Sequence, residues 1–188
     1  PGGSAPEMNR WWCTLDHVRT DVPARYKDQV ERLRELFLEA CRVRMRSDVP
    51  IGTALSGGLD SSATMSVMAH LKASGRADRS PFALSAFVCS FPGTPFDESA
   101  YAKQVTDRWG IKSHVIEIDP RAGLPRFEEY YYLFEELYIT SLIPFMLTYG
   151  AVKQAGVSVT LDGHGGDELF AGYPIDHMGA LREARWNP

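Results

Sequence analysis

Ser56-Gly57-Gly58-Leu59-Asp60-Ser61-Ser62 forms a turn of small residues between an apolar run, residues 49–55, and a helix-like segment, residues 63–73. Glycine and serine have little side-chain bulk, so the backbone N–H groups of such a turn can approach a phosphate closely. The N-terminus of the following helix carries about half a positive charge, which also favours an anion. The order strand, turn, helix therefore predicts a pyrophosphate-binding loop, with Asp60 as a carboxylate for a phosphate-bound metal.

This turn differs from two commoner phosphate-binding sequences. A Walker-type loop carries Gly-Lys-Ser/Thr at the start of its helix, whereas this chain has no lysine between Lys27 and Lys72. The glycine spacing also differs from the Gly-x-Gly-x-x-Gly fingerprint of dinucleotide-binding folds. The turn is therefore not typical of an ordinary kinase or nucleoside triphosphatase.

A second glycine-rich, acidic turn, residues 162–168, follows another apolar strand-like run, residues 157–161.

The hydrophobic pattern predicts further strands over residues 51–55, 82–90 and 113–118. It predicts helices over residues 23–46, 96–109 and 141–155. The second of these helices is expected to be capped near Asp97 and to end at Gly110, and the third is expected to end at Gly156. The pattern does not assign residues 120–140 to a helix or a strand. Alternating strands and helices predict an α/β fold with a doubly wound, mostly parallel sheet flanked by helices. Because ligands bind beyond the carboxyl ends of such strands, both turns should face one crevice.

The composition limits the classes of protein to which this chain can belong. The chain has 188 residues, of which 44% are hydrophobic and 23% charged, as in an ordinary globular domain. Its formal net charge of −4 argues against a nucleic-acid-binding protein, and no apolar run approaches the roughly 18 residues of a membrane span. The three cysteines lack metal-like spacing and predict a reduced, cytoplasmic protein. We expect a linker or inter-domain segment over residues 1–22 and one domain over residues 23–188, incomplete at its C-terminus.

Three motifs resemble one known family. The first turn resembles the Ser-Gly-Gly-x-Asp-Ser loop of the ATP pyrophosphatase superfamily, and residues 49–62 resemble its asparagine synthetase branch. Residues 161–173 resemble the downstream motif of that branch, and a third match, residues 91–99, lies between the two. The chain therefore resembles the C-terminal synthetase domain of glutamine-hydrolysing asparagine synthetases, which has an adenine nucleotide α-hydrolase-like fold.

The resemblance implies a reaction and its participants. ATP would adenylate aspartate to β-aspartyl-AMP with release of pyrophosphate, and ammonia from glutamine would then give asparagine. The resemblance implies ATP as the nucleotide and Mg²⁺ as the metal. It also implies a glutaminase domain in the full-length protein, and it is compatible with a homodimer. Two alternatives stay open: an adenylating, amide-forming cyclase related to β-lactam synthetase or lasso-peptide cyclase, and a non-catalytic nucleotide-binding module.

By the same resemblance, the site residues fall on the two turns and on the strand ends. Asp60 and Asp167 are assigned to Mg²⁺ and to catalysis, with helix capping as the alternative for both. Backbone N–H groups and hydroxyls of the first turn could stabilise the charge that builds on the departing pyrophosphate. Cys89 is expected to be a small apolar wall near the adenine rather than a nucleophile. The residues assigned to the nucleotide are Leu55, Ser56, Gly57, Gly58, Asp60, Ser61, Ser62, Cys89, Asp162 and Gly163.

Two residues of the second turn depart from the family pattern. His164, assigned to catalysis, stands where asparagine synthetases commonly carry Glu; its imidazole could accept a proton, mark a different nucleophile or be structural. Asp162 stands where Ser is frequent. The family also places a catalytic lysine after the second turn, whereas Lys153 is the last lysine of this chain. The sequence as given is therefore expected to bind ATP, to be impaired in amide formation and to lack glutamine hydrolysis.

Overall fold

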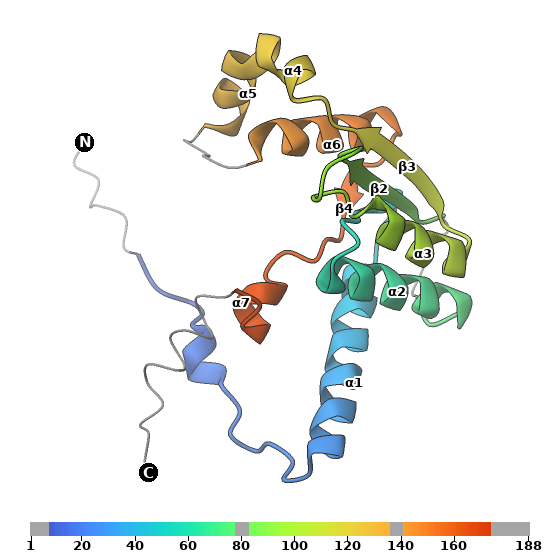
Figure 1. Ribbon diagram of the computed structural model, residues 1–188. Coiled ribbons are helices and arrows are strands. Elements are labelled where there is room, and N and C mark those ends of the chain that lie inside the picture. The colour runs from blue at the N-terminus through green and yellow to red at the C-terminus, as the bar shows by residue number, and fades with distance from the viewer. Residues whose placement is uncertain (1–7, 78–82, 136–140, 174–188) are drawn as a thin grey trace, which may run out of the picture. The chain divides into compact units, whose positions relative to one another are not determined.

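The computed structural model describes residues 8–77, 83–135 and 141–173 (Figure 1). The chain divides into two compact units, residues 1–37 and 38–188. In the first unit, the 3-10 turn η1 (Thr14–His17) stacks the ring of His17 on that of Trp12, with centroids 3.9 Å apart. Helix α1 (Tyr26–Arg44) begins in the first unit and ends in the second. The linker expected over residues 1–22 stays a prediction.

The second unit is built on a parallel sheet with the strand order β3-β2-β1-β4 (Figure 1). Gly52 of β1 pairs with Ser85 of β2 on one side and with Thr160 of β4 on the other. The sheet confirms the predicted fold class, because parallel strands joined through helices are what the alternating pattern requires. The strands are β1 (Ile51–Ala54), β2 (Ser85–Ser90), β3 (Lys112–Glu117) and β4 (Val159–Thr160).

Helices cover both faces of this sheet. Helices α2 (Leu59–Ala73) and α3 (Ser99–Trp109) pack on one face, and α6 (Leu142–Gln154) packs against β2 and β3 on the other (Figure 1). The chain runs from β1 through β2 to β3 and then returns to β4, on the far side of β1. Since crossovers between parallel strands are right-handed, this reversal places α6 opposite α2 and α3. Strands β1 and β4 therefore flank the switch point at which such sheets bind ligands.

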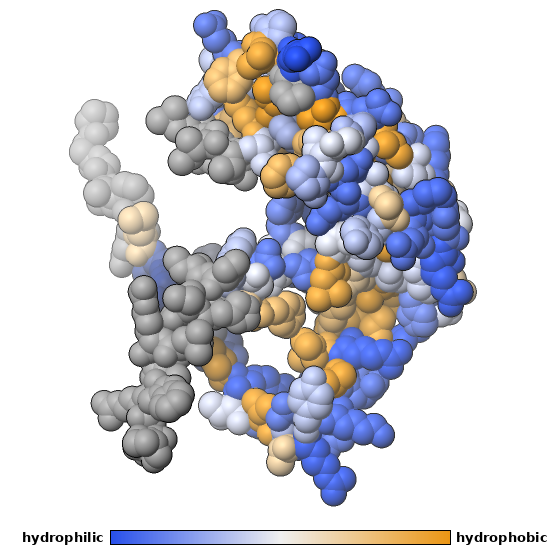
Figure 2. Space-filling view, viewed as in Figure 1, coloured by the Kyte–Doolittle hydropathy of each residue, from blue (hydrophilic) through white to orange (hydrophobic). Residues whose placement is uncertain are grey.

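The segment between β3 and α6, which the sequence pattern leaves unplaced, is helical over its described residues. It forms α4 (Pro120–Gly123), η2 (Leu124–Arg126) and α5 (Phe127–Phe134), and both α4 and α5 pack against α6. Apolar side chains gather on the surface over this segment (Figure 2). Its exposed hydrophobic residues include Leu124, Phe127 and Leu133. No helix within residues 8–77, 83–135 and 141–173 has the length and apolar character needed to cross a membrane.

Several element boundaries differ from those predicted. Helix α1 begins at Tyr26 rather than at residue 23, and α2 begins at Leu59 rather than at residue 63. Strand β2 begins at Ser85 rather than at residue 82, which lies outside the described residues. Helix α3 begins at Ser99 rather than at residue 96, because a turn precedes it, in which the Asp97 N–H donates to the Thr94 carbonyl at 3.3 Å. The Asp97 carboxylate accepts the Ser99 N–H at 3.0 Å, but the N-cap of α3 is Glu98, whose side chain makes no capping hydrogen bond. Strand β4 is shorter than the predicted residues 157–161.

Substitution of two leucines of one helix in this unit should have unequal effects on the free energy of unfolding. Leu71 of α2 is 0% exposed, whereas Leu59, in the first turn of the same helix, is 84% exposed. Leu71→Ala should lower the free energy of unfolding by about 2–5 kcal/mol, because it removes buried apolar surface and leaves a cavity. Leu59→Ala should change it by no more than about 0.5 kcal/mol. Denaturant unfolding of both variants measures the difference, and equal effects would contradict the placement of Leu71 in the core.

Candidate functional site

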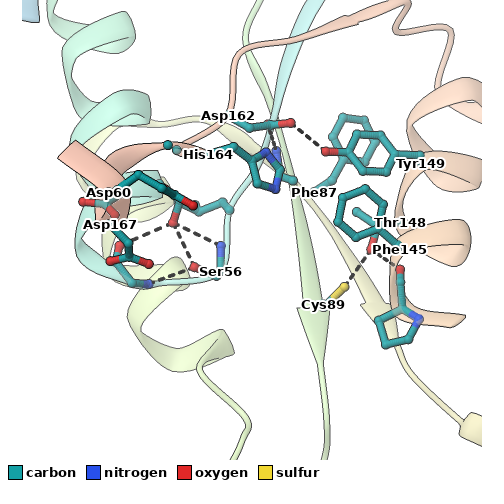
Figure 3. Close-up of a pocket in the computed structure, with 18 of the residues that line it drawn as sticks. Ser56, Asp60, Phe87, Cys89, Phe145, Thr148, Tyr149, Asp162, His164 and Asp167 are labelled. Carbon is teal, nitrogen blue, oxygen red and sulfur yellow. Dashed lines mark hydrogen bonds between the residues drawn. The ribbon is translucent and has the colours of Figure 1, made fainter. Parts of the chain in front are cut away.

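A cavity of about 380 Å³ lies at the carboxyl ends of β1 and β4, at the switch point of the sheet (Figure 3). Its lining has two distinct parts. One end is polar and carries Ser56, Asp60 and Asp167, and the other end is formed largely by aromatic and apolar side chains of β2 and α6. His164 projects between the two ends (Figure 3). The two glycine-rich turns therefore share one cavity, as their positions after parallel strands predict.

The first turn is held in shape by its own hydrogen bonds. The Ser61 hydroxyl lies 3.0 Å from that of Ser56 and accepts the Ser56 N–H at 3.3 Å, while the Ser56 hydroxyl accepts the Gly58 N–H at 3.1 Å. Gly57 has a φ of 97°, which favours glycine, and a Cβ there would lie 2.7 Å from the Glu98 carbonyl oxygen. The third motif, residues 91–99, thus supports this turn from outside the cavity.

The second turn packs its backbone directly against the first. A Cβ on Gly163 would lie 2.7 Å from the Ser61 backbone nitrogen and 2.9 Å from the Asp60 carbonyl carbon. A Cβ on Gly166 would overlap the Asp60 carboxylate. Glycine at both positions therefore allows the two turns to touch. Helix α7 (Gly166–Phe170) starts at this contact, so Asp167 lies on the same side of the cavity as Asp60 (Figure 3).

The carboxylates of Asp60 and Asp167 have no hydrogen-bond or ion-pair partner within the described part of the chain. The N-caps of α2 and α7 are Gly58 and Gly165, so neither aspartate caps the helix that follows it. Over the same residues, no three His, Cys, Asp or Glu side chains form a closed metal site. Two unpartnered carboxylates on a cavity fit Mg²⁺, which usually takes one or two protein carboxylates together with phosphate oxygens and water.

Asp162 differs from these two aspartates because both of its carboxylate oxygens are engaged. One oxygen accepts the Ala54 N–H at 2.7 Å, and the other accepts the hydroxyls of Tyr149 and Thr160 at 2.7 and 2.8 Å. Burial, together with this carboxylate, raises the pKa of Tyr149, so the phenol keeps its proton. The sequence predicts only a nucleotide contact at position 162; the side chain additionally joins β1, β4 and α6.

Cys89 lines the cavity at the end of β2, where the sequence predicts a small apolar wall. Its sulfur lies 2.7 Å from the Thr148 hydroxyl, which itself donates to the Pro144 carbonyl at 2.7 Å. Burial raises the pKa of the Cys89 thiol above its usual range. The thiolate is therefore disfavoured, in agreement with a wall rather than a nucleophile.

Most of the predicted site residues line the cavity, but two do not. Gly57 faces the start of α3, and the Ser62 N–H donates to the Gly58 carbonyl at 3.1 Å inside the first turn of α2, so it is not free for a phosphate. The predicted residues that do line it are Leu55, Ser56, Gly58, Asp60, Ser61, Cys89, Asp162, Gly163, His164 and Asp167.

One wall of the cavity was not predicted. Helix α6 contributes Pro144, Phe145, Thr148 and Tyr149, which share one face of the helix. That helical spacing is the only signal in the sequence, and it does not distinguish a cavity wall from a core contact. The exposed His164 ring lies 5.9 Å from that of Phe145. None of residues 120–135, which the sequence pattern leaves unplaced, lines the cavity.

Comparisons with known proteins identify relatives of this chain. A profile of the family described as asparagine synthase matches residues 32–188. Amidase chry2 of Gibberella zeae is 32% identical over 94% of this chain and 28% of its own length. The glutamine-hydrolysing asparagine synthetase of Asparagus officinalis is 32% identical over 94% of this chain and 30% of its own length.

The chain thus spans less than a third of these curated relatives. Among solved structures, an NH3-dependent NAD synthetase from Campylobacter jejuni aligns over 76% of this chain and 60% of its own. Its TM-score is 0.49 at 16% identity, which is too low to support an argument about function. The family profile covers most of this chain, and it includes the three motifs around the cavity. The chain belongs to the asparagine synthase family.

Proposed function

We propose that this region binds ATP across the cavity and activates a carboxylic acid as its adenylate, with loss of pyrophosphate, before an amine attacks to form an amide. One observation carries the proposal: Gly163 packs against Ser61 and Asp60, so that two carboxylates and the N-terminus of α2 meet at one end of the cavity. Membership of the asparagine synthase family supports an amide-forming ligase.

The polar end of the cavity suits a departing pyrophosphate. The Leu59 and Asp60 N–H groups belong to the first turn of α2, where backbone donors have no partner within the helix. These donors and the Ser56 hydroxyl can stabilise charge that develops on the leaving group. The described lining carries no lysine or arginine, so its carboxylates alone would repel a nucleoside triphosphate. Asp60 and Asp167 would hold Mg²⁺, which supplies the neutralising charge when bound.

His164 is the proposed proton acceptor of this site. Its exposed side chain lies between the polar end and the α6 wall, and no hydrogen bond ties it to a described residue. A neutral imidazole there can accept the proton that an attacking amine loses. We propose aspartate as the acid and ammonia as the amine, delivered by a glutaminase domain of the full-length protein. A cytoplasmic location and a homodimer stay predictions.

A second candidate is an adenylating enzyme that acts on another acid or amine. Two relatives at 32% identity carry the name amidase, chry2 of Gibberella zeae and chyE of Penicillium rubens. The presence of His164 at a position that commonly holds Glu in asparagine synthetases favours the same candidate.

Pyrophosphate exchange distinguishes these functions. The full-length protein, with Mg²⁺ and ATP, should incorporate labelled pyrophosphate into ATP when aspartate is added, because adenylation is reversible before the amine attacks. Glutamate and acetate serve as control acids. Stimulation by a different acid would support the second candidate, and ATP binding without exchange in the presence of any acid would support a non-catalytic nucleotide-binding module.

A further inference from the structure

The side chain of Asp162 takes the place of a backbone acceptor at the end of the sheet. Gly52 of β1 pairs with Thr160 of β4. A regular parallel ladder continued from this pair would direct the Ala54 N–H at the Leu161 carbonyl. That N–H instead donates to one carboxylate oxygen of Asp162, at 2.7 Å. The backbone ladder therefore stops here, and the chain leaves the sheet as the second turn.

The other carboxylate oxygen of Asp162 accepts two hydroxyls. They belong to Tyr149 of α6 and Thr160 of β4, at 2.7 and 2.8 Å. One half-buried side chain thus attaches the start of the second turn to both β1 and α6. Serine, which is frequent at this position in asparagine synthetases, has a single side-chain oxygen. Attachment to both sides therefore suits a side chain with two polar atoms.

The attachment of Asp162 is passed on to the carboxylates of the polar end. Gly163 follows it directly, and a Cβ on Gly163 would lie 2.9 Å from the Asp60 carbonyl carbon, so the backbones of the two turns are in contact. The Gly166 N–H donates to the Gly163 carbonyl at 3.2 Å, which closes the second turn. Asp167 is the next residue. The point at which the second turn is attached therefore determines where Asp167 lies relative to Asp60.

We propose that Asp162 is a positioning residue of the metal site: by attaching the second turn to β1 and α6, it sets the separation of Asp60 and Asp167 and thereby the Mg²⁺ concentration that nucleotide binding requires. The inference rests on the proposed function, in which those two carboxylates hold Mg²⁺. Residues that orient metal ligands without touching the metal change metal affinity by about 10–100-fold when they are substituted. This role differs from the direct nucleotide contact that the sequence predicts at position 162.

The test measures the dissociation constant of ATP for the full-length protein, by calorimetry, over a series of Mg²⁺ concentrations. The Mg²⁺ requirement is the concentration at which the tightening of ATP binding is half-maximal. Asp162→Ala removes the acceptor of all three donors, so it should raise this requirement about tenfold or more and leave the dissociation constant at saturating Mg²⁺ within about threefold of wild type. Weaker ATP binding at saturating Mg²⁺ with an unchanged requirement would instead identify a nucleotide contact and overturn the inference.

Asp162→Asn separates the position of the second turn from the charge of the carboxylate. The amide oxygen can accept the Ala54 N–H, and the amide NH₂ can donate to the hydroxyl oxygens of Tyr149 and Thr160, so both attachments persist. This variant should keep the Mg²⁺ requirement within about threefold of wild type. A requirement raised as far as in Asp162→Ala would assign the effect to the charge and contradict a positioning role.

Leu71→Ala is the control for lost stability, because Leu71 is buried in the same unit and does not line the cavity. It should keep the wild-type Mg²⁺ requirement, and a rise equal to that of Asp162→Ala would attribute the effect to stability alone. If Asp162→Ala does not fold, the double variant Tyr149→Phe with Thr160→Val decides, because it removes the two hydroxyl donors and leaves the Ala54 bond. It should raise the requirement by about threefold or more, and a wild-type requirement would overturn the inference.

Pyrophosphate exchange separates this inference from the proposed function. The expected shifts in the variants, without exchange by the wild-type protein in the presence of any acid, contradict the proposed function alone. Exchange by the wild-type protein, with an unchanged Mg²⁺ requirement in Asp162→Ala, contradicts the inference alone. ATP binding by the wild-type protein that does not respond to Mg²⁺ contradicts both the metal assignment and the inference.

Discussion

Asp60→Asn and Asp167→Asn should each reduce the aspartate-dependent release of pyrophosphate by the full-length protein by about 100-fold or more. Both carboxylates line the cavity without a hydrogen-bond or ion-pair partner in the described chain, so the change removes a negative charge and a metal ligand but no hydrogen bond or ion pair to a described residue. Asparagine also has nearly the same shape as aspartate. A coupled assay of pyrophosphate, performed over a range of Mg²⁺ concentrations, measures the effect and should show a higher Mg²⁺ requirement in both variants.

Two controls make this result specific to the metal. Asp107→Asn alters an exposed aspartate of α3 and should release pyrophosphate at the wild-type rate. Any glutaminase activity of the full-length protein should persist in all three variants, which reports that the rest of the protein is folded. Wild-type pyrophosphate release by both Asp60→Asn and Asp167→Asn would show that the metal assignment is wrong.

Gly163→Ala should weaken ATP binding and slow adenylation together, by about 100-fold. Its added methyl group would lie 2.7 Å from the Ser61 nitrogen and 2.9 Å from the Asp60 carbonyl carbon. Both are backbone atoms, which cannot rotate away as a side chain can, so the second turn must move off the first. That movement displaces Asp167 relative to Asp60. The dissociation constant of ATP and the rate of pyrophosphate exchange measure the two consequences.

Gly150→Ala is the matched control for this glycine substitution. Gly150 lies in α6, and a Cβ there would meet no atom within 4 Å. Alanine should therefore be accepted without loss of ATP binding, and it should stabilise the helix by up to about 1 kcal/mol. If Gly163→Ala bound ATP as tightly as Gly150→Ala does, contact between the two turns would not be needed for the site.

The parts of the site that depend on local chain geometry could be predicted from the sequence. The first turn passes from the end of a strand through a turn to a helix cap and a first helical turn, and each of these positions directly restricts the type of residue that it accepts. The second turn has the same arrangement after β4. Because the carboxyl ends of parallel strands meet at one edge of the sheet, the two turns could be predicted to lie together. The same local signals place Gly110, with a φ of 63°, at the end of α3.

The parts that depend on long-range packing could not be predicted in this way. The role of the Asp162 side chain requires knowledge that Ala54, Tyr149 and Thr160 surround it, and no local pattern encodes three partners from three elements. In the sequence, Phe145 and Tyr149 are indistinguishable from ordinary apolar core positions of a helix. Residues 120–135 form short helices that pack on α6 rather than on the sheet, so neither strand nor helix periodicity is sustained long enough to identify them.

The strand order also governs when the sheet can be completed during synthesis. Strand β1 receives one neighbour, β2, about 30 residues later, but its other neighbour is β4, and the bond between Ala54 and Asp162 joins residues 108 positions apart. Until β4 has left the ribosome, β1 presents an unpaired edge to other chains, which is a recognised route to aggregation. We therefore expect nascent chains stalled between β3 and β4 to depend on chaperones, and to bind nucleotide only after β4 has joined the sheet.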